Sequence, residues 1–235
     1  MMTLLCNFLV WFLTLNFSSA VKFPLQAEMY PEYQGRVEFT GALSDTIAPF
    51  LPICVMECVK NDECLTFFFN SDKKQCVTHS TYLDFRKPNM VDKGWKYYIM
   101  KDLSGRCPSP YMFYRNRNYC YKIYLIPSIN YHAIKFTCGQ NGGRLAVVDS
   151  QEKYDFFVQI VGNRLDLELR VAIQGRNNGS QWILDDGKPL TYFNWKPGEP
   201  SNAPDENCLV LGKNNTMRDF YCLYPNIPIL FLCEV

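Results

Sequence analysis

Histidine is scarce in this chain of 235 residues, which contains only two, His79 and His132. So few histidines make a multi-histidine metal centre or a histidine-based acid–base scheme difficult to assemble. The sequence also lacks a phosphate-binding loop, a Ser-His-Asp ordering and a metalloprotease helix, so we expect no enzymatic activity. Charge of neither sign is in excess, because 24 Lys and Arg stand against 23 Asp and Glu. This balance excludes binding to nucleic acid or another polyanion through bulk charge.

Cysteine, in contrast, is abundant, and the start of the chain explains its odd count of 11. Residues 1–20 contain no Asp, Glu, Lys or Arg and carry an apolar run from Leu4 to Leu15, followed by Ser18-Ser19-Ala20. This pattern is typical of a secretory signal peptide; the alternative, an uncleaved anchor, is disfavoured because the run is short for a bilayer span of about 20 residues. Cleavage removes Cys6 and leaves an even number of cysteines. In an oxidising compartment this predicts up to five disulfides in a soluble, secreted, extracellular protein.

The remaining cysteines form two groups that are separated by a short polar segment. The first group comprises Cys54, Cys58, Cys64 and Cys76, and the second comprises Cys107, Cys120, Cys138, Cys208, Cys222 and Cys233. Residues 101–106, Lys-Asp-Leu-Ser-Gly-Arg, have the composition of a linker. We therefore place a domain boundary at about residue 104, with one domain at 21–103 and another at 104–235. Each domain is expected to fold independently, with no disulfide across the boundary.

The first domain is predicted to be a short helix joined to a β-hairpin. The helix is expected over residues 52–60, with proline in its first turn, and its two cysteines share one face because they are four residues apart. Residues 64–69 and 75–78 have strand composition around a polar turn, and residues 94–100 form a closing strand. A four-cysteine zinc site is the alternative, but paired CxxC knuckles are absent and the compartment is oxidising, so disulfides are favoured.

This cysteine pattern, followed by Gly94-Trp95-Lys96-Tyr97-Tyr98, resembles the PAN/apple family over roughly residues 38–101. The resemblance implies the disulfides Cys54–Cys76 and Cys58–Cys64, with the helix packed on a curved antiparallel sheet. Members of that family bind proteins or carbohydrates, and the sequence does not indicate which.

The second domain is predicted to contain two helices. The first spans residues 130–138 and is closed by glycine. Residues 145–148 form a short buried strand, after which Asp149, with Glu152 three positions on, has the pattern of a helix start. The second helix presents an apolar face that comprises Tyr154, Phe157, Val158 and Val161. Beyond residue 170 the pattern changes to short strands and loops.

The motifs of this domain resemble those of C-type lectins. They are, in order, Cys138 before Gly142-Gly143-Arg144-Leu145-Ala146, then Trp182-x-Leu184-x-Asp186-Gly187, Asn194-Trp195, Gly198-Glu199-Pro200, Cys208, Cys222 and Cys233. Residues 170–173 depart from the family's aromatic-Ile-Gly-Leu stretch and keep only its small and apolar character. The resemblance spans residues 107–235 and implies an α+β fold with two helices, antiparallel sheets and a long ligand loop. It also implies the disulfides Cys107–Cys120, Cys138–Cys233 and Cys208–Cys222.

In that family the loop corresponding to residues 198–208 holds Ca²⁺, and five side chains ligate both the ion and, through it, two neighbouring sugar hydroxyls. The resemblance assigns metal-binding and carbohydrate-binding positions to Glu199, Ser201, Glu206 and Asp219. The three carboxylates match the family pattern, whereas Ser201 and Arg218 stand where asparagine is usual.

The two replaced amides change the chemistry of this site. Ser201 can offer a hydroxyl oxygen to the ion, but it cannot ligate through oxygen while donating from nitrogen to a sugar. Arg218 has no acceptor, and its permanent charge opposes a nearby divalent cation, so we expect it to limit affinity more than Ser201 does. Alternatively, Arg218 pairs with Glu206 or Asp219 in the place of the ion. Unless the loop is only a solvated acidic segment, Ca²⁺ is expected to bind weakly, at about 10⁻⁴–10⁻³ M.

These features predict a non-enzymatic recognition protein of two small disulfide-stapled α+β domains that binds glycans or glycoproteins with Ca²⁺ as cofactor. The alternative is a protein-binding ectodomain on the same fold, whose calcium and sugar site has decayed. The retained carboxylates favour the first interpretation, and the losses at Ser201 and Arg218 favour the second. Two sequons, at Asn178 and Asn214, predict N-glycosylation. The sequence indicates neither the oligomeric state nor the particular sugar.

Overall fold

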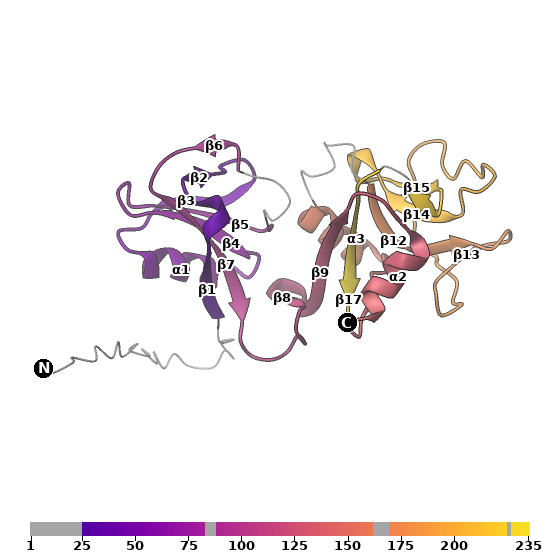
Figure 1. Ribbon diagram of the computed structural model, residues 1–235, viewed down its shortest axis with the longest axis horizontal. Helices are drawn as coiled ribbons and strands as arrows, with labels where there is room; N and C mark the ends of the chain where they lie inside the picture. Colours follow the sequence, from indigo (N-terminus) through magenta and orange to yellow (C-terminus); the bar gives the residue numbers. More distant parts are fainter. Residues whose placement is uncertain (1–24, 83–87, 162–169, 225–226) are drawn as a thin grey trace, which may run out of the picture.

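The computed structural model describes residues 25–82, 88–161, 170–224 and 227–235. The expected signal peptide lies outside this part of the chain. Two lobes lie side by side, and the chain passes from one to the other after strand β7 (Trp95–Asp102) (Figure 1). Within the described ranges, no helix is both long and apolar enough to cross a membrane.

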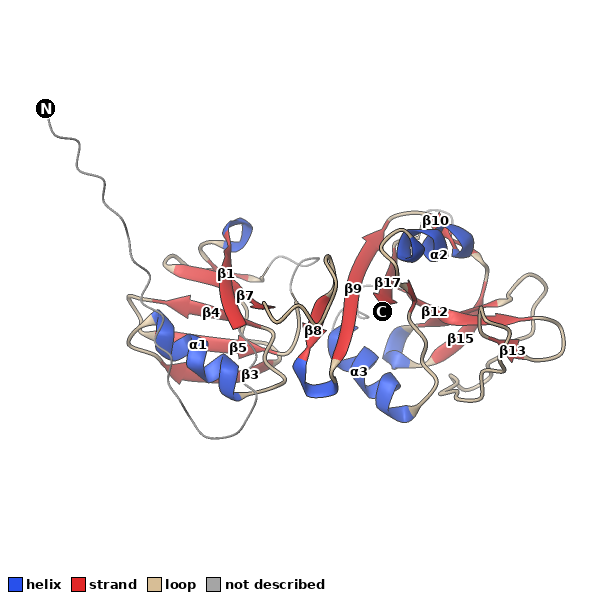
Figure 2. Ribbon diagram, turned by 90° about the horizontal axis from the view of Figure 1, so that it is seen from below, coloured by secondary structure: helices blue, strands red, loops and turns tan. Residues whose placement is uncertain are grey.

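The N-terminal lobe is an antiparallel sheet that carries one helix. Its five strands follow the order β1-β7-β4-β5-β3. The bounds of the other four strands are β1 Leu25–Tyr30, β3 Ala42–Ile47, β4 Thr66–Asn70 and β5 Gln75–His79. Helix α1 (Leu51–Lys60) covers one face of this sheet (Figure 2). The 3-10 helix η1 (Pro31–Tyr33) and the strand pair of β2 (Arg36–Val37) and β6 (Met90–Val91) complete the lobe.

Both faces of this sheet are covered, which explains the run of three phenylalanines in β4. Phe67 and Phe69 belong to a buried cluster on the α1 side that includes the four cysteines of the lobe. Phe68 belongs to a separate cluster on the other side, with Trp95 and Tyr97. Because successive side chains of a strand point to opposite faces, an uninterrupted apolar strand is stable only when both faces are buried.

The sheet contains two strands that the sequence pattern did not indicate. β1 pairs with β7 along its whole length, from Leu25↔Asp102 to Tyr30↔Tyr97. β7 therefore lies inside the sheet and is not its closing edge. β3 forms the opposite edge, beside β5. Both edge strands mix polar with apolar residues and contain no fully buried side chain, so a search for apolar runs does not find them.

The C-terminal lobe is built on a mixed sheet with the strand order β15-β14-β12-β17-β9-β8. Within it β12 and β17 run parallel, whereas the other neighbours are antiparallel. The helices are η2 (Arg115–Arg117), α2 (Tyr131–Gly139), α3 (Gln151–Val161) and η4 (Lys213–Asn215). The strands are β8 (Met112–Tyr114), β9 (Tyr119–Ile126), β10 (Ile129–Asn130), β11 (Arg144–Leu145), β12 (Arg170–Asn177), β13 (Trp182–Ile183), β14 (Cys208–Leu211), β15 (Met217–Phe220), β16 (Leu223–Tyr224) and β17 (Ile229–Glu234). The strand expected at 145–148 is thus shorter, although all four of these residues are buried.

Helices α2 and α3 both begin at side-chain caps. At α2 the side chain of Asn130 accepts a hydrogen bond of 2.8 Å from the amide of Ala133. At α3 the cap is the hydroxyl of Ser150, which accepts a hydrogen bond of 3.2 Å from the amide of Lys153. The expected cap, Asp149, is therefore wrong by one residue, because the helix begins one position later than the sequence pattern indicates.

The buried face of α3 is also rotated from the expected one. The fully buried residues are Phe156, Phe157, Ile160 and Val161, whereas Tyr154 and Val158 are half-buried. The ring of Phe156 contacts three tyrosines of the β8–η2–β9 segment, which are Tyr114, Tyr119 and Tyr121, at centroid distances of 5.0, 4.9 and 5.3 Å. These aromatic contacts determine which face of α3 is buried. Helical periodicity in the sequence does not reveal that face, because the contacts come from tertiary packing.

Five disulfides stabilise the two lobes. They are Cys54–Cys76, Cys58–Cys64, Cys107–Cys120, Cys138–Cys233 and Cys208–Cys222. These are the pairs that the two family resemblances imply. Each pair lies within one lobe, and the pair between α2 and β17 spans 95 positions of the sequence. A cross-link over so long a segment removes much of the freedom of the unfolded chain.

The two lobes share a buried apolar seam, although the sequence predicts independent domains. Leu65 and Tyr82 of the N-terminal lobe belong to the same buried cluster as Tyr114, Tyr121 and Phe156 of the C-terminal lobe. The ring centroids of Tyr82 and Tyr121 are 6.3 Å apart. The polar linker is therefore accompanied by direct packing of one lobe on the other.

Gly143 follows α2 at a point where the chain has no room for a side chain. A Cβ atom there would overlap the hydroxyl of Tyr111 and lie 2.6 Å from the carbonyl oxygen of Glu234. We predict that Gly143→Ala lowers the free energy of unfolding by about 1–3 kcal/mol, because backbone that is crowded in this way cannot easily relax. Gly139→Ala is the matched control, since nothing lies within 4 Å of the added Cβ. Equal losses for the two variants in urea denaturation would contradict the prediction.

Candidate functional site

The segment expected to carry the site, residues 198–208, is an irregular loop with anchored ends. Before it, the amide of Lys196 donates a hydrogen bond of 2.8 Å to the carbonyl oxygen of Met217 in β15. The loop ends at Cys208, the first residue of β14, and the disulfide from Cys208 to Cys222 closes the β14–β15 hairpin. Both ends of the loop are thus fixed relative to β15.

Asp219 projects from β15 and is only 1% exposed. Side chains alternate along a strand, so Asp219 shares one face of β15 with Met217, and Arg218 lies on the other. Burial of a carboxylate is unfavourable unless donors satisfy it. The amide of Ser201 donates to one oxygen of Asp219 at 3.0 Å, and the amide of Asn202 donates to the other at 2.8 Å. The backbone of the loop therefore satisfies the buried charge.

The hydroxyl of Ser201 lies between the acids of the site. It is 2.8 Å from Oε2 of Glu206 and 3.3 Å from Oδ2 of Asp219, and it has one hydrogen to donate. Its oxygen accepts a hydrogen bond of 3.2 Å from the amide of Ala203. The amide of Ser201 is also 3.2 Å from Oε2 of Glu199. All four residues that the resemblance assigns to the site thus meet at Ser201.

The pKa values of Glu199 and Asp219 shift in opposite directions. Burial raises the pKa of Glu199, and the hydrogen bond to Asp219 and the charge of Asp219 raise it further. Burial alone would raise the pKa of Asp219, but hydrogen bonds from Glu199 and from the amides of Ser201 and Asn202 outweigh it and lower the pKa. Of this pair, Glu199 is therefore the first to bind a proton as the pH falls.

Arg218 forms no ion pair with the acids of the loop among the described residues, although its charge acts on one of them, Glu199. Its guanidinium carbon is 5.2 Å from the centroid of the Phe220 ring, on the opposite face of β15 from Asp219. The ion pairs of the described residues include none between Arg218 and Glu206 or Asp219. The expectation that Arg218 takes the place of the ion is therefore wrong, because strand alternation turns its side chain away. Its charge still opposes the rise in the pKa of Glu199.

The donor chemistry of the loop fits a calcium ion. Ca²⁺ takes oxygen ligands and favours carboxylates, and the loop offers three carboxylates and one hydroxyl around Ser201. No preassembled group of three or more His, Cys, Asp or Glu side chains occurs in the described part of the chain. Ser201 stands between the acids and its hydrogen bonds occupy their oxygens. An ion that binds here competes with Ser201 and Asn202 for the oxygens of Asp219.

The backbone donors of this site were not predicted from the sequence. The amides of Ser201 and Asn202 hold Asp219, and residue type alone does not reveal where an amide points. The residue types contained one signal, because asparagine adopts the left-handed conformation of turns more readily than most residues, and Asn202 has a φ of 54°. A turn at Pro200-Ser201-Asn202 therefore aims consecutive amides in one direction.

The two sequons lie on the surface of the C-terminal lobe. Asn178 is exposed in the turn after β12, and its side-chain oxygen accepts a hydrogen bond of 3.0 Å from the amide of Ser180. Asn214 is exposed within η4, where its φ is 64°. Both side chains are thus accessible from solvent.

Residues 128–235 match the family model described as Lectin C-type domain. The mouse protein named low affinity immunoglobulin epsilon Fc receptor is 30% identical over 89 residues, which cover 37% of this chain and 26% of that protein. The human protein named C-type lectin domain family 17, member A is 29% identical over 120 residues, which cover 49% of this chain and 29% of that protein. The match thus spans less than a third of the length of either relative.

Among solved structures, the mouse scavenger receptor C-type lectin carbohydrate-recognition domain is similar, with 24% identity and a TM-score of 0.43. The match covers 55% of this chain and 95% of that chain. The family model and the two relatives show that the C-terminal part of this chain contains a C-type lectin-like domain. The resemblance in the motifs of that domain is therefore confirmed.

Asp219→Asn tests whether the buried carboxylate holds the loop. The variant keeps the shape of the side chain but removes the charge that two backbone amides of the loop satisfy. We predict a loss of about 1.5–3 kcal/mol in the free energy of unfolding near neutral pH in chelator, because hydrogen bonds to charged groups are the stronger class. Asp205→Asn, in the same loop and exposed, is the control and should change it by less than about 0.5 kcal/mol. Similar losses for both variants in urea denaturation would show that Asp219 does not anchor the loop.

Proposed function

We propose that this chain is a carbohydrate-recognition protein whose C-type lectin-like domain binds glycans or glycoproteins with the help of Ca²⁺ at the 198–208 loop. The observation that supports this is the convergence of Glu199, Glu206 and Asp219 on Ser201. Acids this close repel one another unless they are protonated, hydrogen-bonded or neutralised by a cation. A divalent cation would satisfy them together.

Each residue has a defined task in this proposal. Glu199, Glu206 and Asp219 supply carboxylate oxygens, and Ser201 supplies its hydroxyl oxygen. Ca²⁺, when bound, provides a positive centre that neighbouring hydroxyls of a sugar can ligate. Carboxylate oxygens with a free lone pair accept hydrogen bonds from the same hydroxyls. Because two amide side chains of the family pattern are absent, we expect Ca²⁺ to bind at about 10⁻⁴–10⁻³ M.

The N-terminal lobe is, in this proposal, a PAN/apple-like module of a secreted, N-glycosylated protein without enzymatic activity. The placement of α1 on an antiparallel sheet and the two disulfides of this lobe support the first part. Five disulfides are typical of proteins from an oxidising, extracellular compartment. The exposure of Asn178 and Asn214 supports their glycosylation.

A second candidate is a protein-binding ectodomain whose calcium and sugar site has decayed. The observation that favours it is that the amides of Ser201 and Asn202 already satisfy Asp219. A loop of this kind needs no ion to keep its shape. The two candidates differ in one measurable property, because an ion that binds only the folded chain raises its free energy of unfolding.

Thermal melting with and without Ca²⁺ separates the two candidates. At a Ca²⁺ concentration of about 10–100 times the dissociation constant, we predict a stabilisation of about 1.4–2.7 kcal/mol relative to chelator. Glu206→Gln should abolish most of it, since the variant removes one of three carboxylates. Asp205→Asn should retain it. No response of the wild-type protein to Ca²⁺ would support the second candidate.

Melting at a series of Ca²⁺ concentrations also shows which of the two replaced residues, Ser201 or Arg218, limits calcium affinity more. Ser201→Asn should tighten Ca²⁺ binding more than Arg218→Asn does, because Arg218 lies against Phe220 and forms no ion pair with the acids. This order reverses the one expected from the sequence. A larger increase in Ca²⁺ affinity for Arg218→Asn would show instead that the charge of Arg218 limits binding. Retention of the wild-type protein and Ser201→Asn on immobilised mannose, with elution by chelator, tests the carbohydrate part directly.

Protons and Ca²⁺ compete for Glu199 in this proposal. Because the pKa of Glu199 is raised above its ordinary value of 4.5, the ion-free folded protein gains a proton there more readily than the unfolded chain. The ion-free protein therefore loses this contribution to stability as the pH rises through the raised pKa. Ca²⁺ binding becomes tighter over the same range, because Glu199 is then ionised. We predict that the stabilisation by Ca²⁺ shrinks as the pH falls from neutral to below the raised pKa of Glu199, as melting in matched buffers would measure. A stabilisation that stays constant over this range would contradict the assignment of Glu199 to the ion.

A further inference from the structure

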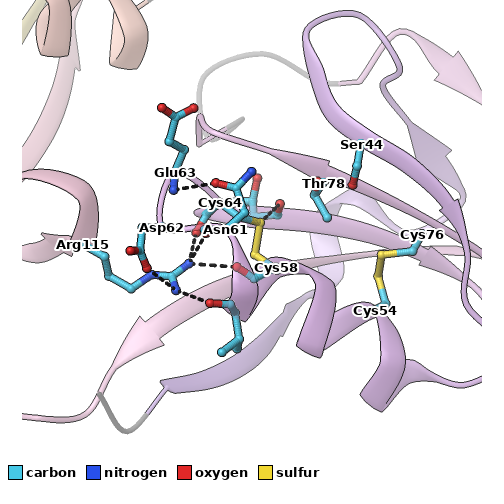
Figure 3. Close-up of a disulfide and its surroundings, with 12 residues drawn as sticks. Ser44, Cys54, Cys58, Asn61, Asp62, Glu63, Cys64, Cys76, Thr78 and Arg115 are labelled. Carbon is cyan, nitrogen blue, oxygen red and sulfur yellow. Dashed lines mark hydrogen bonds and ion pairs between the residues drawn. A yellow bond between two sulfur atoms is a disulfide. The ribbon is translucent and has the colours of Figure 1, made fainter. Parts of the chain in front are cut away.

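Arg115 belongs to the C-terminal lobe, but its side chain is inserted into the N-terminal lobe and is only 4% exposed (Figure 3). Its Nη1 donates a hydrogen bond of 3.0 Å to the carbonyl oxygen of Val59. Its Nη2 lies 3.0, 2.9 and 2.7 Å from the carbonyl oxygens of Cys58, Asn61 and Cys64. One guanidinium group is therefore surrounded by four backbone acceptors of the other lobe.

These acceptors lie where helix α1 ends. The last carbonyls of an α-helix lack partners within the helix, and a cation at that end also interacts favourably with the helix dipole. α1 ends at Lys60, so the carbonyls of Cys58 and Val59 are of this kind. The disulfide between Cys58 and Cys64 closes a ring that contains all four acceptors. It thereby fixes the turn in which the carbonyls point at one centre.

The carbonyls, and not an acid, hold Arg115. Its ion pair with Asp62 has a distance of 3.6 Å, and the side chain of Asp62 is 71% exposed. An ion pair with so exposed a partner contributes little to stability. A buried guanidinium is tolerated only when its donors are satisfied, and here backbone oxygens satisfy them.

The contact of Arg115 continues into the apolar seam between the lobes. Leu65, the residue after Cys64, and Tyr82 are buried together with Tyr114, which directly precedes Arg115. Beside the guanidinium, the side chain of Asn116 donates a hydrogen bond of 3.4 Å to Glu63. Polar and apolar contacts of the two lobes thus adjoin one another.

We propose that the ring closed by Cys58 and Cys64 is a receptor for the Arg115 guanidinium, and that this contact fixes the two lobes as one rigid recognition unit. The lobes then do not behave as two independent modules on a flexible linker. A ligand large enough to reach both lobes meets them in a single orientation, without the ordering cost of a mobile linker. This inference does not depend on calcium or on the identity of the ligand.

Cleavage of the linker in the folded, full-length protein tests the proposal. Residues 103–106 are exposed, and no disulfide joins the lobes in the described part of the chain, so a protease site inserted between Ser104 and Gly105 severs their connection. We expect the nicked lobes to remain together in gel filtration under non-reducing conditions. Separation of the nicked wild-type lobes at micromolar concentration would overturn the proposal.

Variants of Arg115 then show whether this residue holds the lobes together. In Arg115→Met the four hydrogen bonds are lost, so the dissociation constant of the nicked lobes should rise at least about tenfold. Arg117→Met is the matched control, because it removes a charge from the same short helix η2, but Arg117 pairs with Glu152 of its own lobe. This control should dissociate like the wild-type protein.

Arg115→Lys covers the case in which the methionine variant is not secreted. Lysine keeps the charge but replaces the planar fork with one nitrogen, so the nicked lobes of this variant should also dissociate more readily than those of wild type. If the lobes of Arg115→Met, or of Arg115→Lys in its place, bind each other as tightly as wild-type lobes, the apolar seam alone holds them and the proposal is wrong.

Discussion

The burial of the Asp219 carboxylate is the constraint on which the loop at residues 198–208 depends. A charge that is 1% exposed has to be matched by donors, and the loop provides them through the amides of Ser201 and Asn202. The loop has no regular secondary structure, so these contacts hold it against β15. The proton affinity of the site follows from the same feature. Because Asp219 is stabilised in its charged form, the proton is left to Glu199, whose pKa rises.

Arg115 presents the same physical problem with the opposite sign. Asp219 is a buried anion satisfied by backbone amides, and Arg115 is a buried cation satisfied by backbone carbonyls. In both places a disulfide fixes the neighbouring backbone, since one closes the β14–β15 hairpin and another closes the turn after α1. Disulfides are usually credited with constraining the unfolded chain. Here the Cys58–Cys64 disulfide also keeps backbone carbonyls directed at a buried charge.

The parts of this structure that could be predicted from the sequence are those whose signals are local or belong to a motif. Proline marks the start of helix α1, a capping residue marks helix α2, and an apolar run marks strand β4. The disulfide pairs could be predicted only through family resemblance. The edge strands β1 and β3 were missed, since each depends on a distant partner. The contact of Arg115 with Cys58 joins residues 57 positions apart, and neither residue type predicts it. The direction of Arg218 was missed because it depends on the register of β15.

In the proposed function Ser201 has two tasks that compete, because its hydroxyl already makes hydrogen bonds within the loop and would also ligate the ion. Its hydroxyl donates to Glu206 or Asp219, while its oxygen accepts from the amide of Ala203. An ion would compete with these hydrogen bonds for the lone pairs of the serine and acid oxygens. In that proposal the calcium affinity of the loop is the difference between the attraction of the ion to three carboxylates and the hydrogen bonds that the loop already makes. Asparagine at this position would remove the conflict, because its oxygen can face the ion while its nitrogen remains a donor.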